Sequence, residues 1–81
     1  MDVPDGWRLD EDALVRSFAF KDFAEAFSFL TQVAAHAEAA GHHPDFCLSW
    51  NKVDFRLTTH SAGRVTKRDM ELAEGIRRIA G

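Results

Sequence analysis

Apolar and polar residues alternate along the first quarter of the chain. Trp7 and Leu9 lead into an acidic turn at residues 10–12. The run that follows alternates again and has on its apolar side Leu14, Arg16, Phe18 and Phe20. Alternation on both sides of a turn is typical of a β-hairpin. We therefore predict two short strands within residues 7–20, with Arg16 at an edge because it interrupts the apolar face.

A helical pattern follows from Asp22 to Ala40. Asp22 and Glu25 have the spacing of a capping box, and Gly41 is a typical helix stop. Steps of four and three residues join one apolar stripe, made of Phe23, Phe27, Leu30, Ala34 and Ala37. A second stripe lies on another side of the helix and consists of Phe29, Val33 and His36. Either this helix lies deep in its own core or, as we favour, the extra apolar face is a subunit interface.

A second strand pair and a closing helix complete the pattern. Residues 46–50 form one predicted strand, Asn51 and Lys52 mark a tight turn, and clean alternation predicts another strand over residues 53–60. Thr66 and Asp69 then have the spacing of a helix cap. The core face of the closing helix is predicted to be Leu72, Ala73, Ile76, Ile79 and Ala80.

The element order predicted from these patterns is β-β-α-β-β-α. We expect an α+β fold, a four-stranded antiparallel sheet with the helices packed on one face, in a single domain over residues 1–81. A chain this short buries only about 60% of its unfolded surface, so a monomer would be marginally stable. Assembly into a homodimer or homotetramer, through the 22–40 helix and a sheet edge, is therefore expected.

Composition excludes several classes of protein. The net charge is −3 and the basic residues are scattered, which argues against direct nucleic-acid binding. The N-terminus, Met1 to Gly6, lacks the features of a signal peptide, and no apolar run reaches the roughly 18 residues of a membrane span. A single cysteine, Cys47, fits a reducing compartment. We expect a cytoplasmic protein without membrane contact.

Histidines are the candidate chemical groups. His42 and His43 follow Gly41 and are held by Pro44, and His60 ends the last predicted strand, from which it can reach the same loop. We interpret His36, on the helix, as a solvated surface residue. Imidazole has an unperturbed pKa near 6.5, so general acid–base catalysis is the favoured interpretation.

A zinc site is the less favoured interpretation of these histidines. Adjacent imidazoles in a loop point in different directions, whereas metal sites favour histidines one helical turn apart or a Cys/His pattern. Glu38, one turn before His42, is a candidate to orient that ring. An exposed helix carboxylate is the alternative for Glu38.

Several segments together resemble the pterin-4a-carbinolamine dehydratase family, from about Trp7 to the end of the chain. They are Phe20-Lys21-Asp22-Phe23, Glu38-Ala39-Ala40-Gly41-His42-His43-Pro44, Trp50-Asn51-Lys52-Val53, Leu57-Thr58-Thr59-His60 and Asp69 with Leu72-Ala73. The resemblance implies a lyase that removes water from 4a-hydroxytetrahydrobiopterin or a related pterin. The product is the quinonoid dihydropterin, formed during recycling of the cofactor of aromatic amino acid hydroxylases. It also implies that no metal or coenzyme is used.

The resemblance also implies roles for individual residues. His42 and His60 correspond to general acids that act on the leaving 4a-hydroxyl, and His43 to the group that holds the pterin and accepts the N5 proton. Glu38 corresponds to a carboxylate behind His42, and Asp69 to a carboxylate near His60. The complete expected substrate-binding set is Glu38, Gly41, Phe46, Thr58, Thr59 and Asp69, with Phe46 as a stacking ring.

The chain departs from the family pattern in three places. Gly41 stands where many relatives carry an acidic residue, and Arg64 stands in a loop that is Gly-Gly-Leu in many of them. Animal relatives have an additional helix before the Gly-Trp pair. They also act as dimerisation cofactors of a transcription factor through the long helix, so a partner-binding module is the alternative function. A charge at Phe29 is the change expected to disrupt such a partner.

Overall fold

The elements of the fold are seen in a computed structural model that describes residues 3–81. Met1 and Asp2, part of the stretch examined for a signal peptide, lie outside the described residues. The strands and helices are β1 (Arg8–Asp10), β2 (Ala13–Ala19), α1 (Phe23–Ala40), β3 (Asp45–Ser49), β4 (Lys52–Leu57) and α2 (Lys67–Ala80). This order confirms the predicted β-β-α-β-β-α arrangement.

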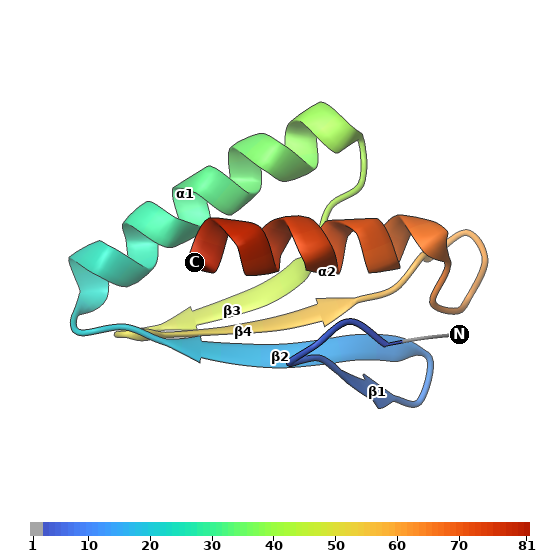
Figure 1. The fold of residues 1–81 in the computed structure, drawn as a ribbon, viewed down its shortest axis with the longest axis horizontal. Coiled ribbons are helices and arrows are strands. Elements are labelled where there is room, and N and C mark those ends of the chain that lie inside the picture. The colour runs from blue at the N-terminus through green and yellow to red at the C-terminus, as the bar shows by residue number, and fades with distance from the viewer. Residues whose placement is uncertain (1–2) are drawn as a thin grey trace.

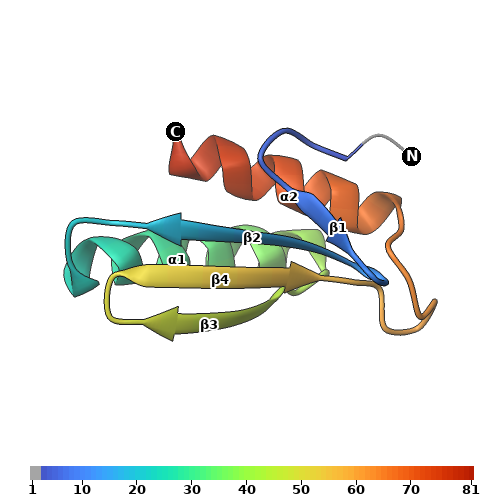
Figure 2. The same ribbon diagram turned by 90° about the horizontal axis from the view of Figure 1, so that it is seen from below.

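The four strands form one antiparallel sheet in the order β1-β2-β4-β3. Both helices pack on one face of this sheet and leave the other face open (Figures 1 and 2). β2 and β4 are therefore central, whereas β1 and β3 are edge strands. No helix in the part of the chain described here is long and apolar enough to cross a membrane.

The core lies between the helices and the central strands. Alternate residues of β4 are buried, and the ring of Phe55 lies 5.8 Å from that of Phe18, 6.0 Å from that of Phe29 and 6.3 Å from that of Trp7. Arg16 lies on the central strand β2, opposite Phe55, and not on an edge strand as predicted. Its guanidinium lies 4.2 Å from the centre of the Phe18 ring. The guanidinium thus packs against the face of an aromatic ring at the border of the core.

The predicted faces of α1 need correction. The buried face consists of Ala26, Phe29, Leu30, Val33 and Ala37, which face the sheet. Phe23 and Phe27 are 49% and 53% exposed, and their rings stack with centroids 5.8 Å apart. Phe29 is therefore a core residue and not a partner-facing one. A helix of 18 residues carries both stripes, and only the packing of the sheet decides which one is buried.

α2 packs across α1 at a glycine. Leu72, Ala73 and Ile76 are buried as predicted, with the last turn of the helix partly buried. A Cβ added at Gly75 would clash with the imidazole of His36, so the absence of a side chain at Gly75 allows the close approach of the two helices. His36 is accordingly half-buried in this helix crossing, which corrects its interpretation as a solvated surface residue.

Two boundaries in the second hairpin also differ from prediction. The turn is formed by Trp50 and Asn51, one residue earlier than expected, because Ser49 pairs with Lys52. The Asn51 side chain donates a 2.8 Å hydrogen bond to the carbonyl of Phe20 and so ties this turn to the end of β2. β4 ends at Leu57 and does not continue to residue 60.

Candidate active site

The end of α1, the start of β3, the end of β4 and the start of α2 meet at one end of the molecule (Figures 1 and 2). A hollow of about 250 Å³ opens there. Its lining residues are Gly41, His42, His43, Thr58, Thr59, His60, Ser61 and Arg68. The structure thus brings all three candidate catalytic histidines to one small cavity.

The end of α1 determines where His42 lies. Gly41 adopts a left-handed conformation, with φ of 67°, which a residue with a Cβ rarely adopts. The N–H of Gly41 donates to the carbonyl of Glu38 and the N–H of His42 to that of Ala37, both at 3.2 Å. Arg68 fixes the same loop from α2, since its guanidinium donates a 2.6 Å hydrogen bond to the carbonyl of Gly41. His42 is therefore anchored by its backbone directly after the helix.

A buried carboxylate holds the ring of His42. Nε2 of His42 lies 2.6 Å from Oδ1 of Asp69, and 12% of the His42 side chain is exposed against none of the Asp69 side chain. The other carboxylate oxygen, Oδ2, accepts hydrogen bonds from the hydroxyl of Thr59 at 2.7 Å and from the N–H of Thr66 at 2.9 Å. The bond from Thr66 is also the cap of α2, so Asp69 both begins this helix and holds His42.

Asp69 is held in its ionised form. Burial alone would raise the pKa of this carboxyl, but the hydrogen bonds from His42, Thr59 and Thr66 outweigh burial and place the pKa below its ordinary value. An ionised carboxylate can only accept hydrogen bonds. Nε2 of His42 must therefore carry the proton in the bond to Asp69, which leaves Nδ1 as the nitrogen available to a bound molecule.

The lowered pKa of Asp69 predicts a loss of stability in acid. A carboxyl whose pKa is depressed by folding stabilises the protein above its unfolded pKa, and this contribution is lost as the pH falls through the folded pKa. The unfolding free energy of wild type should therefore exceed that of Asp69→Asn at pH 5, and the gap should narrow towards pH 3. Urea unfolding of both proteins at several pH values measures this difference in unfolding free energy. Asp12→Asn, at an exposed turn, is the matched control, and a gap that stays constant over this range would contradict the prediction.

The other two histidines also face carboxylates, but at exposed positions. Nε2 of His43 lies 2.7 Å from Oε1 of Glu38, and Nε2 of His60 lies 3.4 Å from Oδ2 of Asp45. The His43 and His60 side chains are 63% and 75% exposed. Exposed ion pairs of this kind contribute about 0–1 kcal/mol, so these two rings are only weakly oriented.

One expected carboxylate pairing is wrong, and Asp69 holds a histidine other than the one it was expected to lie near. Glu38 hydrogen-bonds His43 and not His42, because the turn at Gly41 brings the second histidine back over the last turn of α1. Asp69 contacts His42 and the neighbour of His60, Thr59, and makes no hydrogen bond to His60 in the described chain. Sequence spacing alone could not distinguish these pairings, since His42 and His43 are adjacent.

The remaining expected residues divide between the hollow and its surroundings. Thr58 lines the hollow, although its hydroxyl donates to the carbonyl of Asp12 at 2.8 Å. Phe46 lies outside the histidine hollow, exposed on β3, and lines a neighbouring apolar hollow of about 460 Å³ together with Glu38 and His43. Ser61 and Arg68 line the hollow and were missed, although each directly adjoins an expected site residue, His60 or Asp69.

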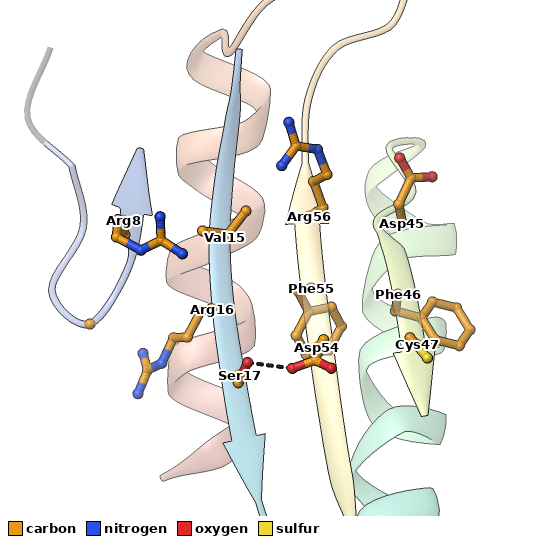
Figure 3. A pocket seen from close by; sticks show the side chains of 11 residues that line it. Arg8, Val15, Arg16, Ser17, Asp45, Phe46, Cys47, Asp54, Phe55 and Arg56 are labelled. Atoms are coloured by element: carbon orange, nitrogen blue, oxygen red, sulfur yellow. Dashed lines mark hydrogen bonds between the residues drawn. The ribbon is translucent and has the colours of Figure 1, made fainter. Parts of the chain in front are cut away.

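A larger hollow, of about 660 Å³, lies on the open face of the sheet (Figure 3). Several of its polar groups are engaged with one another or with nearby residues. Ser17 donates a hydrogen bond to Asp54, and a nitrogen of Arg56 lies 3.0 Å from Oδ2 of Asp10. It adjoins the histidines through Asp45, whose carboxylate faces His60, and through Phe46, which also lines the hollow beside His43. None of the three candidate histidines is among its lining residues, whereas all three line the smaller hollow, which is therefore the better candidate active site.

Metal binding finds no support in the geometry. Over residues 3–81 no group of three or more His, Cys, Asp or Glu side chains is arranged to hold a metal ion. Each histidine of the hollow instead has Nε2 next to its own carboxylate. Such an arrangement suits separate proton transfers by three imidazoles.

Comparisons with known sequences give a consistent family. A family model described as pterin 4 alpha carbinolamine dehydratase matches residues 1–79. A protein of Rhizorhabdus wittichii named "Putative pterin-4-alpha-carbinolamine dehydratase" is 49% identical over 80 residues, which are 96% of this chain and 81% of that protein. A protein of the same name from Rhodopseudomonas palustris is 53% identical over 78 residues, 94% of this chain and 77% of its own length.

Solved structures with the same fold include two with related descriptions. A transcriptional coactivator/pterin dehydratase from Brucella melitensis has a TM-score of 0.91 and 44% identity, over 95% of this chain and 84% of that one. A pterin dehydratase-like protein described as a RuBisCO assembly factor in the alpha-carboxysome has a TM-score of 0.80 and 25% identity. That comparison covers 94% of this chain and 90% of the other.

Proposed function

Because this chain belongs to the pterin-4a-carbinolamine dehydratase family, we propose that it dehydrates 4a-hydroxytetrahydrobiopterin or a related 4a-hydroxypterin to the quinonoid dihydropterin. The observation that carries this proposal is the convergence of three imidazoles on one hollow, one of them held by a buried carboxylate. The hollow, at about 250 Å³, is slightly smaller than the usual range of ligand pockets, about 300–1,000 Å³. It therefore takes the reacting ring and leaves the pterin side chain towards solvent.

The reaction requires two proton transfers. The bond between C4a and the hydroxyl oxygen breaks, and the oxygen leaves as water after receiving a proton. N5 loses its proton, and its electron pair forms the new double bond to C4a. An acid and a base positioned near neutral pH are sufficient for both transfers, and each such group contributes about 100- to 10,000-fold.

His42 is the best-placed acid for the leaving hydroxyl. Its Nδ1 has no hydrogen-bond partner among residues 3–81, its Nε2–H is fixed by Asp69, and its side chain is the least exposed of the three. When Nδ1 carries a proton to be delivered, the ring is a cation and the ionised Asp69 supplies the counter-charge. A ring held in this way needs little reorganisation during the reaction.

His43 and His60 take the remaining roles in the proposed mechanism. His60 assists His42 as an acid at the leaving hydroxyl, and His43 holds the pterin and accepts the N5 proton. Their greater exposure allows both rings to adjust when the substrate binds. Thr58, directly after β4, and Phe46, on β3, are proposed to contact the bound pterin.

The setting of the reaction belongs to the same proposal. We infer that the chain acts in the cytoplasm, in recycling of the pterin cofactor of aromatic amino acid hydroxylases, without metal or coenzyme. The family resemblance supports this setting, and the chemistry requires only proton transfer.

Turnover by the purified chain tests the proposed function. The protein should accelerate formation of quinonoid dihydropterin from a 4a-hydroxypterin generated in the assay, measured by its absorbance against the buffer rate. His60→Ala should lower kcat by about 100-fold or more if this ring is a second acid. A wild-type rate equal to the buffer rate would remove the dehydratase assignment, and a fully active His60→Ala variant would remove this residue from the mechanism.

A partner-binding role is the second candidate function, and the exposed aromatic pair on α1 favours it. Phe23 and Phe27 stack on the outer side of the helix, and β3 has an unpaired edge that carries Phe46. We propose that a second copy of this chain covers these surfaces, giving a homodimer or homotetramer. Sedimentation of the wild type and of Phe27→Glu distinguishes the cases, since a monomeric wild type would exclude self-assembly and leave α1 open to another protein.

A further inference from the structure

Thr59 was expected to contact the substrate, but its hydroxyl is already used within the protein. The residue is 6% exposed, and its Oγ1 lies 2.7 Å from Oδ2 of Asp69 and 2.6 Å from Oγ1 of Thr66. Its backbone is fixed as well, because its N–H donates to the carbonyl of Arg64 and its own carbonyl accepts from Gly63. Little of Thr59 is free to meet a ligand.

The direction of each hydrogen bond follows from which of these side-chain groups carry a proton to donate. A threonine hydroxyl has one proton and two acceptor positions. The carboxylate of Asp69 can only accept, so the proton of Thr59 goes to Oδ2 of Asp69. Thr66 must then donate its own proton to Thr59, which gives a chain from Thr66 through Thr59 and Asp69 to His42. The two carboxylate oxygens are thereby divided, with Oδ2 for the threonines and Oδ1 for His42.

We propose that Thr59 is a positioning residue that acts through Asp69 and fixes His42 as the Nε2–H tautomer. Two short hydrogen bonds on Oδ2, one from the Thr59 hydroxyl and one from the Thr66 N–H, prevent rotation of the carboxylate. Without the Thr59 hydroxyl, that oxygen keeps the backbone N–H of Thr66 at 2.9 Å and the more distant Thr66 hydroxyl at 3.5 Å. The shorter side-chain bond is lost, so the orientation of the carboxylate towards His42 is less restricted. The Nδ1–H tautomer of His42 then becomes populated. In this tautomer Nε2 no longer donates to Asp69, so the carboxylate does not hold the ring for proton delivery from Nδ1.

The consequence for turnover rests on the proposed function, but the consequence for His42 does not. Thr59→Val removes the hydroxyl and keeps the shape of the side chain. We expect kcat to fall about 10- to 100-fold, the effect of one lost hydrogen bond to a charged group, with little change in KM. Thr59→Ser keeps the hydroxyl and should restore most of the rate. Thr31→Val is the matched control, because that exposed hydroxyl donates only to a backbone carbonyl of α1.

Nitrogen-15 NMR of the free protein provides the test that is independent of activity. At a pH where the ring is neutral, wild type and Thr59→Ser should show His42 protonated at Nε2 alone, and Thr59→Val should show a mixture of tautomers. Wild type with the proton on Nδ1, which is measurable even if Thr59→Val fails to fold, would overturn the proposal. A Thr59→Ser variant as impaired as Thr59→Val would also overturn it. So would a Thr59→Val variant in which KM rises and kcat is unchanged, because Thr59 would then be a substrate contact. If the wild type is inactive but His42 shows the expected tautomer, only the proposed function is rejected, and the positioning role of Thr59 stands.

Discussion

Replacing His42 by alanine should lower kcat/KM for a 4a-hydroxypterin by about 100- to 10,000-fold, the range for a positioned acid–base group. This is the largest effect expected of any substitution in the hollow, because His42 is the least exposed of the three rings and is held by Asp69. His43 and His60 are weakly oriented by comparison. Initial rates at several substrate concentrations measure the loss.

The matched control for His42→Ala is a histidine outside the hollow. His36 packs against Gly75 where the helices cross, so His36→Gln changes an imidazole that does not line the histidine hollow. It should retain turnover within a few-fold. Near wild-type activity of a folded His42→Ala variant would contradict the proposed mechanism, and equal losses in both variants would indicate a general effect of histidine removal on the fold.

Leu14→Ala should have the largest effect on stability, lowering the free energy of unfolding by about 2–5 kcal/mol. Leu14 is fully buried in β2 and pairs with Leu57, which is also buried. Folded domains are stable by only about 5–15 kcal/mol, so such a variant is close to unfolding at ordinary temperatures. Urea denaturation followed by circular dichroism measures the change.

Leu9 is a closely matched control because it is the register partner of Leu14 in β1. Directly opposite residues in an antiparallel pair lie on the same side of the sheet, yet Leu9 is 55% exposed. β1 is an edge strand, so the core does not extend over this position. Leu9→Ala should change stability by no more than about 0.5 kcal/mol. Similar losses at Leu9 and Leu14 would show that burial is not what distinguishes them.

Most of the fold could be predicted from local patterns. The alternation around Leu14 and Phe55 and the caps at Gly41 and Asp69 follow from chain-local physics, and the observed element order confirms them. The faces of α1 could not be resolved in the same way. Both of its stripes are apolar, and the choice of Phe29 over Phe27 for the core depends on contacts with Phe18 and Phe55, far away in the sequence.

The candidate site was predictable in its histidines but not in their partners. Sequence spacing places Glu38 one helical turn before His42, and we therefore expected these two side chains to pair. The left-handed turn at Gly41 instead brings His43 within hydrogen-bonding distance of Glu38. The pairing of His42 with Asp69 spans 27 residues and arises only when α2 packs beside the end of α1. Helix capping explains why a carboxylate occurs at position 69, but the same signal does not reveal a second role for its other oxygen.

Asp69 has a consequence for the order in which activity appears during folding. One oxygen of this carboxylate caps α2 through a bond within the helix, whereas the other holds His42 and can do so only after the helix has docked beside the loop that follows α1. A partly folded chain with an intact sheet but an undocked C-terminal helix would lack its oriented imidazole. Regain of turnover after dilution from denaturant would therefore report arrival of the last helix, and not formation of the sheet.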